Sequence, residues 1–316
     1  MIASARITRF LSDTLQLPMT WSTDVADESL ESLIIVGGAF AFAGGEVLQA
    51  LGSAIISAKR LIWIQNDYTV DPPKEESAAE SPFRKAFRTR HESGESPVDF
   101  WTTVERMSTP GCRGGRVIGA GSAYVNWNAM SIYSRSETTP ERSESLLYYG
   151  SFRQPRVESF DRYLRQPAAQ TTVSSPSKKF LQYDSPLIHH VGKVDDLRAL
   201  TDTCSLGLYI EDKRSHAEFH SPASRFYEML GAGLPIVFQP ECQRMLARAG
   251  YEVGDYVIWS RDDITEKMKI AEQLGIEQRE RWLEKTRAEC DSLVPRVMEL
   301  WSAGGCQRRC TGEVIT

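Results

Sequence analysis

The chain has 316 residues, of which 41% are hydrophobic and 25% are charged, and its formal net charge is −5. This length suits two domains of about 150 residues, each large enough to bury its own core. The composition excludes a disordered or collagen-like chain, and the negative charge excludes a wholly basic nucleic-acid coat while leaving room for a local basic patch.

The cysteines and the apolar runs indicate the compartment. The six cysteines are scattered, and Cys306 and Cys310 lack the histidine or second pair that a zinc site requires. No apolar run approaches the length of a bilayer span, and the first ten residues contain no long apolar segment. We therefore expect reduced thiols, no membrane partner and a cytoplasmic protein, in the host cytoplasm if it is viral.

The first clear element is an apolar, β-branched run at residues 33–36, followed by glycines and by a helical pattern at 46–51. This order predicts a Rossmann-like strand, glycine loop and helix. The spacing is not that of a dinucleotide fingerprint, so we discount NAD. Gly38 is a candidate for close backbone approach to a donor ligand, and the alternative is a plain strand-to-helix connection.

A second buried strand is predicted at residues 60–68, with polar residues arriving at its carboxyl end. Ligands of open α/β sheets lie beyond the carboxyl ends of the strands. Asp67 is therefore the candidate general base, and Asn66 and Tyr68 are candidate acceptor contacts. The alternative for Asp67 is an Asx-turn that ends the strand.

Residues 70–116 form a predicted basic insertion that binds the acceptor. Within it, four basic residues alternate with Phe83 and Phe87 in a pattern suited to phosphate contact: Arg84, Lys85, Arg88 and Arg90. A solvated loop or helix with docked phenylalanines is the alternative. Residues 117–119 and 123–133 are expected to be the last strands of a first domain at 1–140, with a linker at 134–145.

The second half repeats the alternation of strands and helices. We expect strands at residues 146–150, 205–210, 236–238 and 256–259, a polar loop at 211–220, and a long helical region at 262–301 broken near Gly275 and Pro295. Strands that alternate with helices predict mostly parallel sheets and an α/β fold.

Residues 221–238 carry the strongest local signal. Ser221 is a predicted N-cap with Pro222 at the first helical position, and glycines end the helix before an apolar strand. The N-terminus of this helix, at Ser224 and Arg225, can bind phosphate, and Glu228 lies one turn further along. The alternative is a solvated Glu228 and a glycine C-cap.

The segment Glu-Met-Leu-Gly-Ala-Gly-Leu-Pro-Ile-Val at 228–237 resembles the C-terminal signature of GT-B glycosyltransferases. The resemblance implies two Rossmann-like domains facing a cleft, an acceptor domain at 1–140 and a nucleotide-sugar domain at 146–316, whose terminal helix can cross back onto the first domain. In this family the acidic residue, here Glu228, binds the ribose, and the helix start faces the diphosphate. The resemblance further assigns Arg153, with Arg156 as second choice, to the leaving diphosphate, and the Lys193-Val194 turn to the nucleobase.

The activity implied is transfer of a hexose, most simply glucose from UDP-glucose, to a hydroxyl acceptor, with no metal strictly required. Residues 65–68 also resemble Gln-His-Asp-His in phage enzymes that α-glucosylate hydroxymethylcytosine in DNA, although Asn66 and Tyr68 replace both histidines. We therefore expect double-stranded DNA with hydroxymethylated bases as acceptor. The alternatives are a polysaccharide, lipid or small-molecule acceptor, and a non-catalytic nucleotide-binding protein of the same fold.

Overall fold

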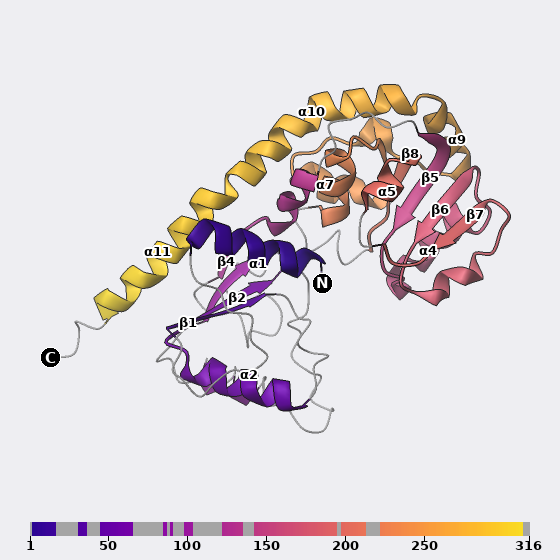
Figure 1. Ribbon diagram of the computed structural model, residues 1–316. Coiled ribbons are helices and arrows are strands. Elements are labelled where there is room, and N and C mark those ends of the chain that lie inside the picture. The colour runs from indigo at the N-terminus through magenta and orange to yellow at the C-terminus, as the bar shows by residue number, and fades with distance from the viewer. Residues whose placement is uncertain are drawn as a thin grey trace. The chain divides into compact units, whose positions relative to one another are not determined.

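The computed structural model describes residues 2–16, 31–36, 45–65, 85–86, 89–90, 98–103, 122–134, 142–194, 197–212 and 222–311 (Figure 1). The chain divides into two compact units, with Met1–Trp127 and Ser292–Thr316 in unit 1 and Asn128–Asp291 in unit 2. The first division therefore falls before the predicted boundary at 140. The last 25 residues group with unit 1 instead of the second domain, which is the expected return of the terminal helix.

Unit 1 contains a four-stranded parallel sheet in the order β1-β2-β3-β4. Its elements are α1 (Ile2–Leu15), β1 (Ser32–Val36), α2 (Gly45–Ser57), β2 (Arg60–Gln65), β3 (Val98–Thr102), β4 (Ser122–Tyr124) and α11 (Leu293–Thr311). Helices α1 and α2 lie on opposite faces of the sheet (Figure 1). Residues 61–64 of β2 are all buried, as expected for a parallel strand covered on both faces.

Strand β3 corrects the prediction of an insertion at 70–116. Val98 and Trp101 are buried, and β3 pairs with β2 from Leu61↔Val98 onward, so this part of the segment belongs to the sheet. The free energy gained by burying the β-branched Val98 and the aromatic Trp101 favours a strand, although turn-forming residues lie on either side in the sequence.

The expected strand at 123–133 is also largely wrong. Strand β4 ends at Tyr124, and a 3-10 helix, η3 (Trp127–Ser134), follows. The change of structure coincides with Trp127, which is buried and donates its indole N–H to the carbonyl oxygen of Trp101 at 3.3 Å. Residues 117–119 lie outside the described residues.

Helix α11 is attached to the sheet of unit 1 by Arg60. The guanidinium of Arg60 donates to the backbone carbonyls of Leu300 and Trp301 at 3.1 and 2.8 Å and lies 4.7 Å from the centre of the Trp301 ring. Its Nε donates to Asp99 at 3.1 Å. One buried arginine thus joins β2, β3 and the terminal helix.

Unit 2 contains a five-stranded parallel sheet in the order β7-β6-β5-β8-β9. Its strands are β5 (Ser143–Tyr149), β6 (Gln170–Ser174), β7 (Ile188–Val191), β8 (Cys204–Tyr209) and β9 (Ile236–Phe238). The chain proceeds outward from β5 to β7 and then returns to β8 beside β5. The sheet therefore has a topological switch point between β5 and β8, which is where open α/β sheets bind ligands.

Helices and 3-10 turns connect these strands: η4 (Gln154–Arg156), α4 (Val157–Leu164), η5 (Lys178–Gln182), α5 (Arg198–Thr201), α7 (Ser224–Gly231), η6 (Pro240–Cys242), α8 (Gln243–Arg248), η7 (Gly254–Tyr256), α9 (Arg261–Lys269) and α10 (Ala271–Asp291). The strand expected at 256–259 is wrong, because Val257 forms only an isolated bridge with Phe238. Within the described part of the chain, no helix is long and apolar enough to cross a membrane.

The long helical region is broken elsewhere than predicted. Its helices separate at Ile270 and Ser292, whereas Gly275 and Pro295 lie within helices. Gly275 lets α10 approach Pro235, whose Cγ would lie 3.1 Å from an added Cβ. Pro295 lies in the first turn of α11, where its missing N–H costs no intrahelical hydrogen bond.

Candidate nucleotide-binding site

Helix α7 begins at the switch point of unit 2, close to the carboxyl ends of β5 and β8. It starts at Ser224, two residues later than a Ser221 cap predicts, and its N-cap is Ala223. The backbone N–H of Ala223 donates to the Tyr209 hydroxyl at 2.8 Å, which ties the start of the helix to the end of β8. Ser221 lies outside the described residues.

The helix ends as the sequence predicts. Gly233 has a φ of +67°, and the N–H of Leu234 donates to the carbonyl of Met229 at 2.9 Å, which is the 6→1 bond of a Schellman motif. Phe226, Tyr227, Met229 and Leu230 are buried, whereas Ser224 and Glu228 remain partly exposed. The side chain of Arg225 is only 11% exposed, so the exposed part of α7 carries two of the three predicted ligand-binding residues.

Glu228 is held by the last residue of β5. The hydroxyl of Tyr149 donates to Oε2 of Glu228 at 3.0 Å and lies 3.2 Å from the carbonyl oxygen of Arg225. Tyr149 is buried, whereas Glu228 is partly exposed. This contact fixes one oxygen of the Glu228 carboxylate, a group that can accept hydrogen bonds from sugar hydroxyls.

Two buried arginines share one buried carboxylate beside the start of α7. Arg156 donates to Oε2 of Glu211 and Arg225 donates to Oε1, so the two oxygens have different partners. The Nε of Arg156 lies 3.6 Å from Asp212, and Arg225 also donates to the carbonyl of Ile210 at 2.9 Å. We call Arg156, Glu211, Asp212 and Arg225 the charge cluster.

The electrostatics of the charge cluster follow from its burial. Burial alone lowers the pKa of Arg225, but the adjacent Glu211 carboxylate outweighs this and holds the pKa above its usual value. Burial, reinforced by Glu211, raises the pKa of the Tyr209 hydroxyl well above its usual value. Both groups therefore keep their protons at neutral pH, and Arg225 keeps its charge.

Gly150 makes room for this cluster. Its φ is +143°, and an added Cβ would lie 2.4 Å from Nη1 of Arg225. Both the backbone conformation and the space require glycine at this position. The loop after β5 therefore crosses directly over the Arg225 guanidinium.

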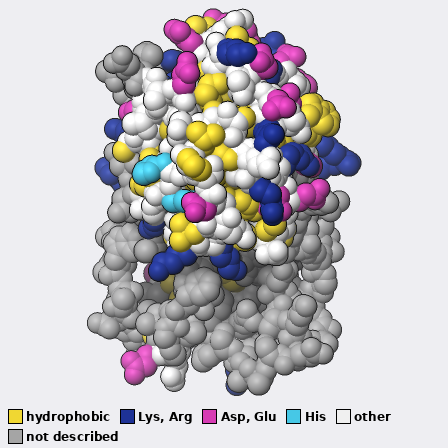
Figure 2. Space-filling view, turned by 90° about the vertical axis from the view of Figure 1, so that its right-hand side faces the viewer, with side chains coloured by type: hydrophobic (Ala, Val, Ile, Leu, Met, Phe, Trp, Pro, Cys, Tyr) yellow, Lys and Arg dark blue, Asp and Glu magenta, His cyan; other side chains and the backbone are white. Residues whose placement is uncertain are grey.

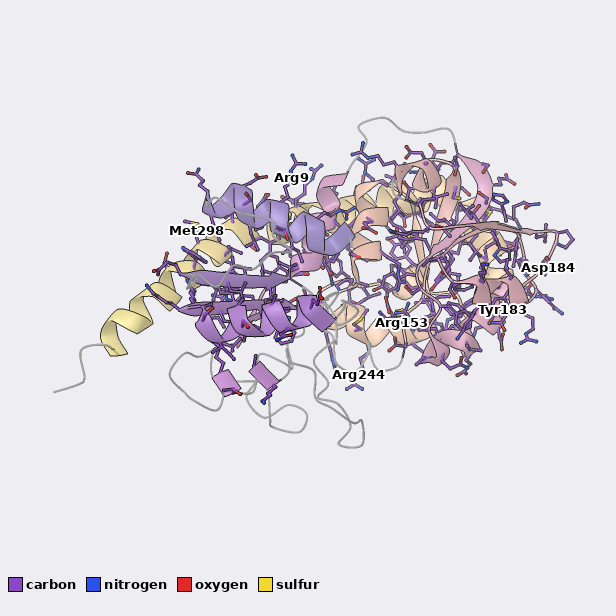
Figure 3. The ribbon with its side chains drawn as sticks, turned by 60° about the horizontal axis from the view of Figure 1, so that its bottom comes forward. Arg9, Arg153, Tyr183, Asp184, Arg244 and Met298 are labelled. Carbon is purple, nitrogen blue, oxygen red and sulfur yellow. The ribbon has the colours of Figure 1, made fainter. Side chains whose placement is uncertain are left out.

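The remaining predicted donor residues lie in other connections at the carboxyl edge of the same sheet. Arg153, labelled in Figure 3, is exposed between β5 and η4, and Lys193 and Val194 follow β7. Arg153 is thus the accessible cation after β5, whereas Arg156 is part of the charge cluster. Among the described residues, no three His, Cys, Asp or Glu side chains gather to hold a metal ion.

The predicted acceptor residues are only partly covered by the structure. Asn66, Tyr68, Arg84 and Arg88 lie outside the described residues, as do the donor candidate Gly38 and the candidate base Asp67, and Lys85 is exposed. Arg90 corrects the prediction of a phosphate contact. Its side chain is buried and donates to the carbonyls of Ile55, Ala58 and Lys59 at 2.6, 2.5 and 3.3 Å, so that it caps the C-terminus of α2.

Solved structures resemble this chain over nearly its full length. The crystal structure of the DNA modifying enzyme β-glucosyltransferase, with and without uridine diphosphoglucose, aligns with 94% of this chain and 90% of its own, at a TM-score of 0.58 and 14% identity. The chain has the GT-B fold. T4 phage BGT in complex with UDP-glucose covers 94% of this chain and 91% of its own, at a TM-score of 0.57 and 12% identity. Its complex with UDP and Mn²⁺ covers 88% of this chain and 84% of its own, at a TM-score of 0.58 and 14% identity.

At the level of sequence, no family model and no curated protein matches this GT-B chain. The likeness therefore lies in the arrangement of elements. It extends over both units, because the T4 phage complex with UDP-glucose covers 94% of the chain.

Sequence reasoning missed three residues of the candidate site. Glu211 is the second residue after β8, which ends at Tyr209. An acid at the carboxyl end of a predicted strand is a sequence signal for a ligand-binding residue. Gly150 directly follows β5 and was likewise visible as a glycine at a strand end. The role of Tyr149 had no such signal, because only the fold brings it to Glu228, 79 residues away.

Proposed function

We propose that the protein is a glycosyltransferase that moves a hexose, glucose in the first instance, from a UDP-sugar to a hydroxyl acceptor. The observation that carries this proposal is the Tyr149–Glu228 pair beside the N-terminus of α7. It supplies an oriented carboxylate for a ribose within one helical turn of backbone N–H groups suited to a diphosphate. Support comes from the GT-B fold, which is shared with proteins solved in complex with UDP-glucose.

In the proposed reaction the bond between the anomeric carbon and the diphosphate oxygen breaks, and the acceptor oxygen forms a bond to that carbon. UDP leaves with the electron pair, so positive charge is needed where the diphosphate departs. Arg153 and the start of α7 would supply it directly, and the buried charge of Arg225 lies beneath the Gly150 loop. The Lys193-Val194 turn would meet the nucleobase.

We assign to Asp67, two residues beyond the end of β2, the role of accepting the proton of the acceptor hydroxyl. As the hydroxyl attacks, its proton would pass to this carboxylate, or the carboxylate would orient the hydroxyl. The acceptor we propose is a hydroxymethylated base in double-stranded DNA. The grounds are the strand-end tetrad at 65–68 and the fold shared with a DNA modifying enzyme.

The experiment is incubation of the full-length protein with UDP-glucose and duplex DNA containing hydroxymethylcytosine or hydroxymethyluracil, followed by digestion to nucleosides and mass analysis. A nucleoside heavier by one hexose is expected. UDP release without a modified nucleoside would keep the transferase and reject the DNA acceptor. Failure to bind UDP at all would contradict the donor site.

Two variants test the assigned roles separately. Glu228→Ala removes a charged hydrogen-bonding group and should weaken UDP binding about 10- to 100-fold. Asp67→Asn should leave UDP binding unchanged and slow transfer by about 10²- to 10⁴-fold. Glu284→Gln, at an exposed position of α10, is the matched control and should change neither.

A further inference from the structure

Exposed basic side chains follow four of the five strands of the unit 2 sheet. We call these five residues the basic row: Lys193 after β7, Lys178 and Lys179 after β6, Arg153 after β5, and Arg244 after β9. Because every strand pairing in this sheet is parallel, all of these connections leave from one edge, the carboxyl edge. The connection after β8 instead begins with the buried charge cluster. The sheet topology thus collects cations that are far apart in the sequence.

The basic row is longer than a nucleotide diphosphate. Strands β7 and β9 are four strand spacings apart in the sheet, which corresponds to about 19 Å. In Figure 3, Arg244, Arg153 and Tyr183, the residue after η5, lie in this order along one side of unit 2. A diphosphate bound at the start of α7 reaches only the neighbouring connections. The members of the row on η5 and α8 therefore suit a second and more extended anion.

Several acids in these connections already pair with other side chains. The described acids between the end of β5 and α8 are Glu158, Asp161, Asp184, Asp202, Glu211, Asp212, Glu228 and Glu241. Asp161 pairs with Arg165 at 2.9 Å, and Asp184 is exposed. Glu211 and Asp212 are buried against Arg156 and Arg225, and Glu241 pairs with Arg162 at 3.0 Å. Among the described residues, Lys178 and Arg244 form no ion pair. Figure 2 shows acidic side chains mainly toward the top of the coloured surface and Lys and Arg side chains more often below it.

The support beneath the lysines is rigid and aromatic. Nζ of Lys179 lies 5.8 Å from the centre of the Phe152 ring, and Phe152 packs against Phe160 and Phe180 of the core. The Phe180 side chain, in the middle of η5, is buried. The two lysines therefore project from an anchored turn next to the Arg153 connection.

We propose that the basic row binds the phosphate backbone of DNA, with Lys178, Lys179 and Arg244 contacting phosphates that the donor site does not use. This inference rests on the DNA acceptor of the proposed function and adds the surface that holds it. Duplex DNA carries one negative charge per about 1.7 Å of its axis, so a row of about 19 Å meets more phosphates than it has cations. Such contacts position the duplex without reading its sequence.

The test is the salt dependence of affinity for a fluorescent DNA duplex, measured by anisotropy between about 50 and 200 mM salt. The variant Lys178→Gln, Lys179→Gln, Arg244→Gln removes three charges but keeps polar side chains of similar length. We expect the slope of log affinity against log salt to become shallower by about 2.7, from about 0.9 per phosphate contact. UDP affinity and the unfolding temperature should stay at wild-type values.

A second triple variant, Lys267→Gln, Lys269→Gln, Arg287→Gln, makes the same change in net charge on α9 and α10, which carry no member of the basic row, and should leave the slope unchanged. An unchanged slope in the first variant, or an equal change in both, would overturn the proposal. A protein that binds UDP but no DNA would overturn this surface and leave the donor site intact. DNA binding without UDP binding would contradict the proposed transferase and leave the surface standing.

Discussion

The substitution Glu211→Gln tests whether the charge cluster stabilises unit 2 around the start of α7. The variant keeps the size of the side chain but removes the charge shared by Arg156 and Arg225, whose side chains are only 4% and 11% exposed. Removing one partner of a buried ion pair costs about 3–5 kcal/mol, because the remaining charge stays buried without compensation. Unit 2 spans residues 128–291, a size at which this loss lowers the unfolding midpoint by about 6–20 °C.

Thermal unfolding followed by tryptophan fluorescence measures this loss, with Glu266→Gln as the matched control. Glu266 pairs with Lys269 at the surface, where both side chains are more than 60% exposed, so its loss should cost less than about 1 kcal/mol. Equal midpoints for Glu211→Gln and the control would refute the stabilising role. A double-mutant cycle with Arg156→Met provides a second test, because the two losses should fall short of additivity by at least about 1 kcal/mol.

Three further predictions concern single positions. Gly150→Ala should lower the free energy of unfolding by about 1–3 kcal/mol or more and weaken UDP binding, since φ is +143° and Arg225 fills the space. Gly254→Ala, with nothing within 4 Å of an added Cβ, should be nearly neutral in the same unfolding and binding assays. Arg90→Ala should lower stability by about 1–3 kcal/mol without changing the salt dependence of DNA binding, and a lower salt slope would contradict its structural role. Burial raises the pKa of Tyr163 to about 12, so the unfolded chain loses this proton first and stability falls from about pH 10 to about pH 12. Over that range Tyr163→Phe should lose about 2.7 kcal/mol less than the wild type in urea unfolding, and parallel pH profiles would refute the assignment.

Local patterns predict the buried strands and the C-terminal end of α7 because they record burial and backbone conformation. The apolar runs at 33–36, 60–65 and 146–149 all form strands, and Gly233 ends α7 as a left-handed residue. Signals that depend on tertiary contacts were misread. Gly275 and Pro295 look like breaks in a sequence, yet the packing of Pro235 and the position in a first turn accommodate them.

The candidate site shows the same division. The position of Glu228 on α7, one turn after Ser224, follows from helical spacing alone. The fate of each arginine does not, because Arg84, Lys85, Arg88 and Arg90 look alike in the sequence, whereas Arg90 is buried under three carbonyl groups. Charge counting cannot distinguish a cation that caps a helix from one that meets a ligand, since the difference lies in contacts made across 31 to 35 residues.

The return of α11 to unit 1 has a consequence for how the chain acquires its structure during synthesis. The partners of Arg60 at Leu300 and Trp301 are translated some 240 residues later. Unit 2, which is continuous, can therefore complete its core while unit 1 still lacks a helix. A nascent chain halted at residue 291 should present a protease-resistant second unit and a protease-sensitive first one, and release of the last 25 residues should protect both.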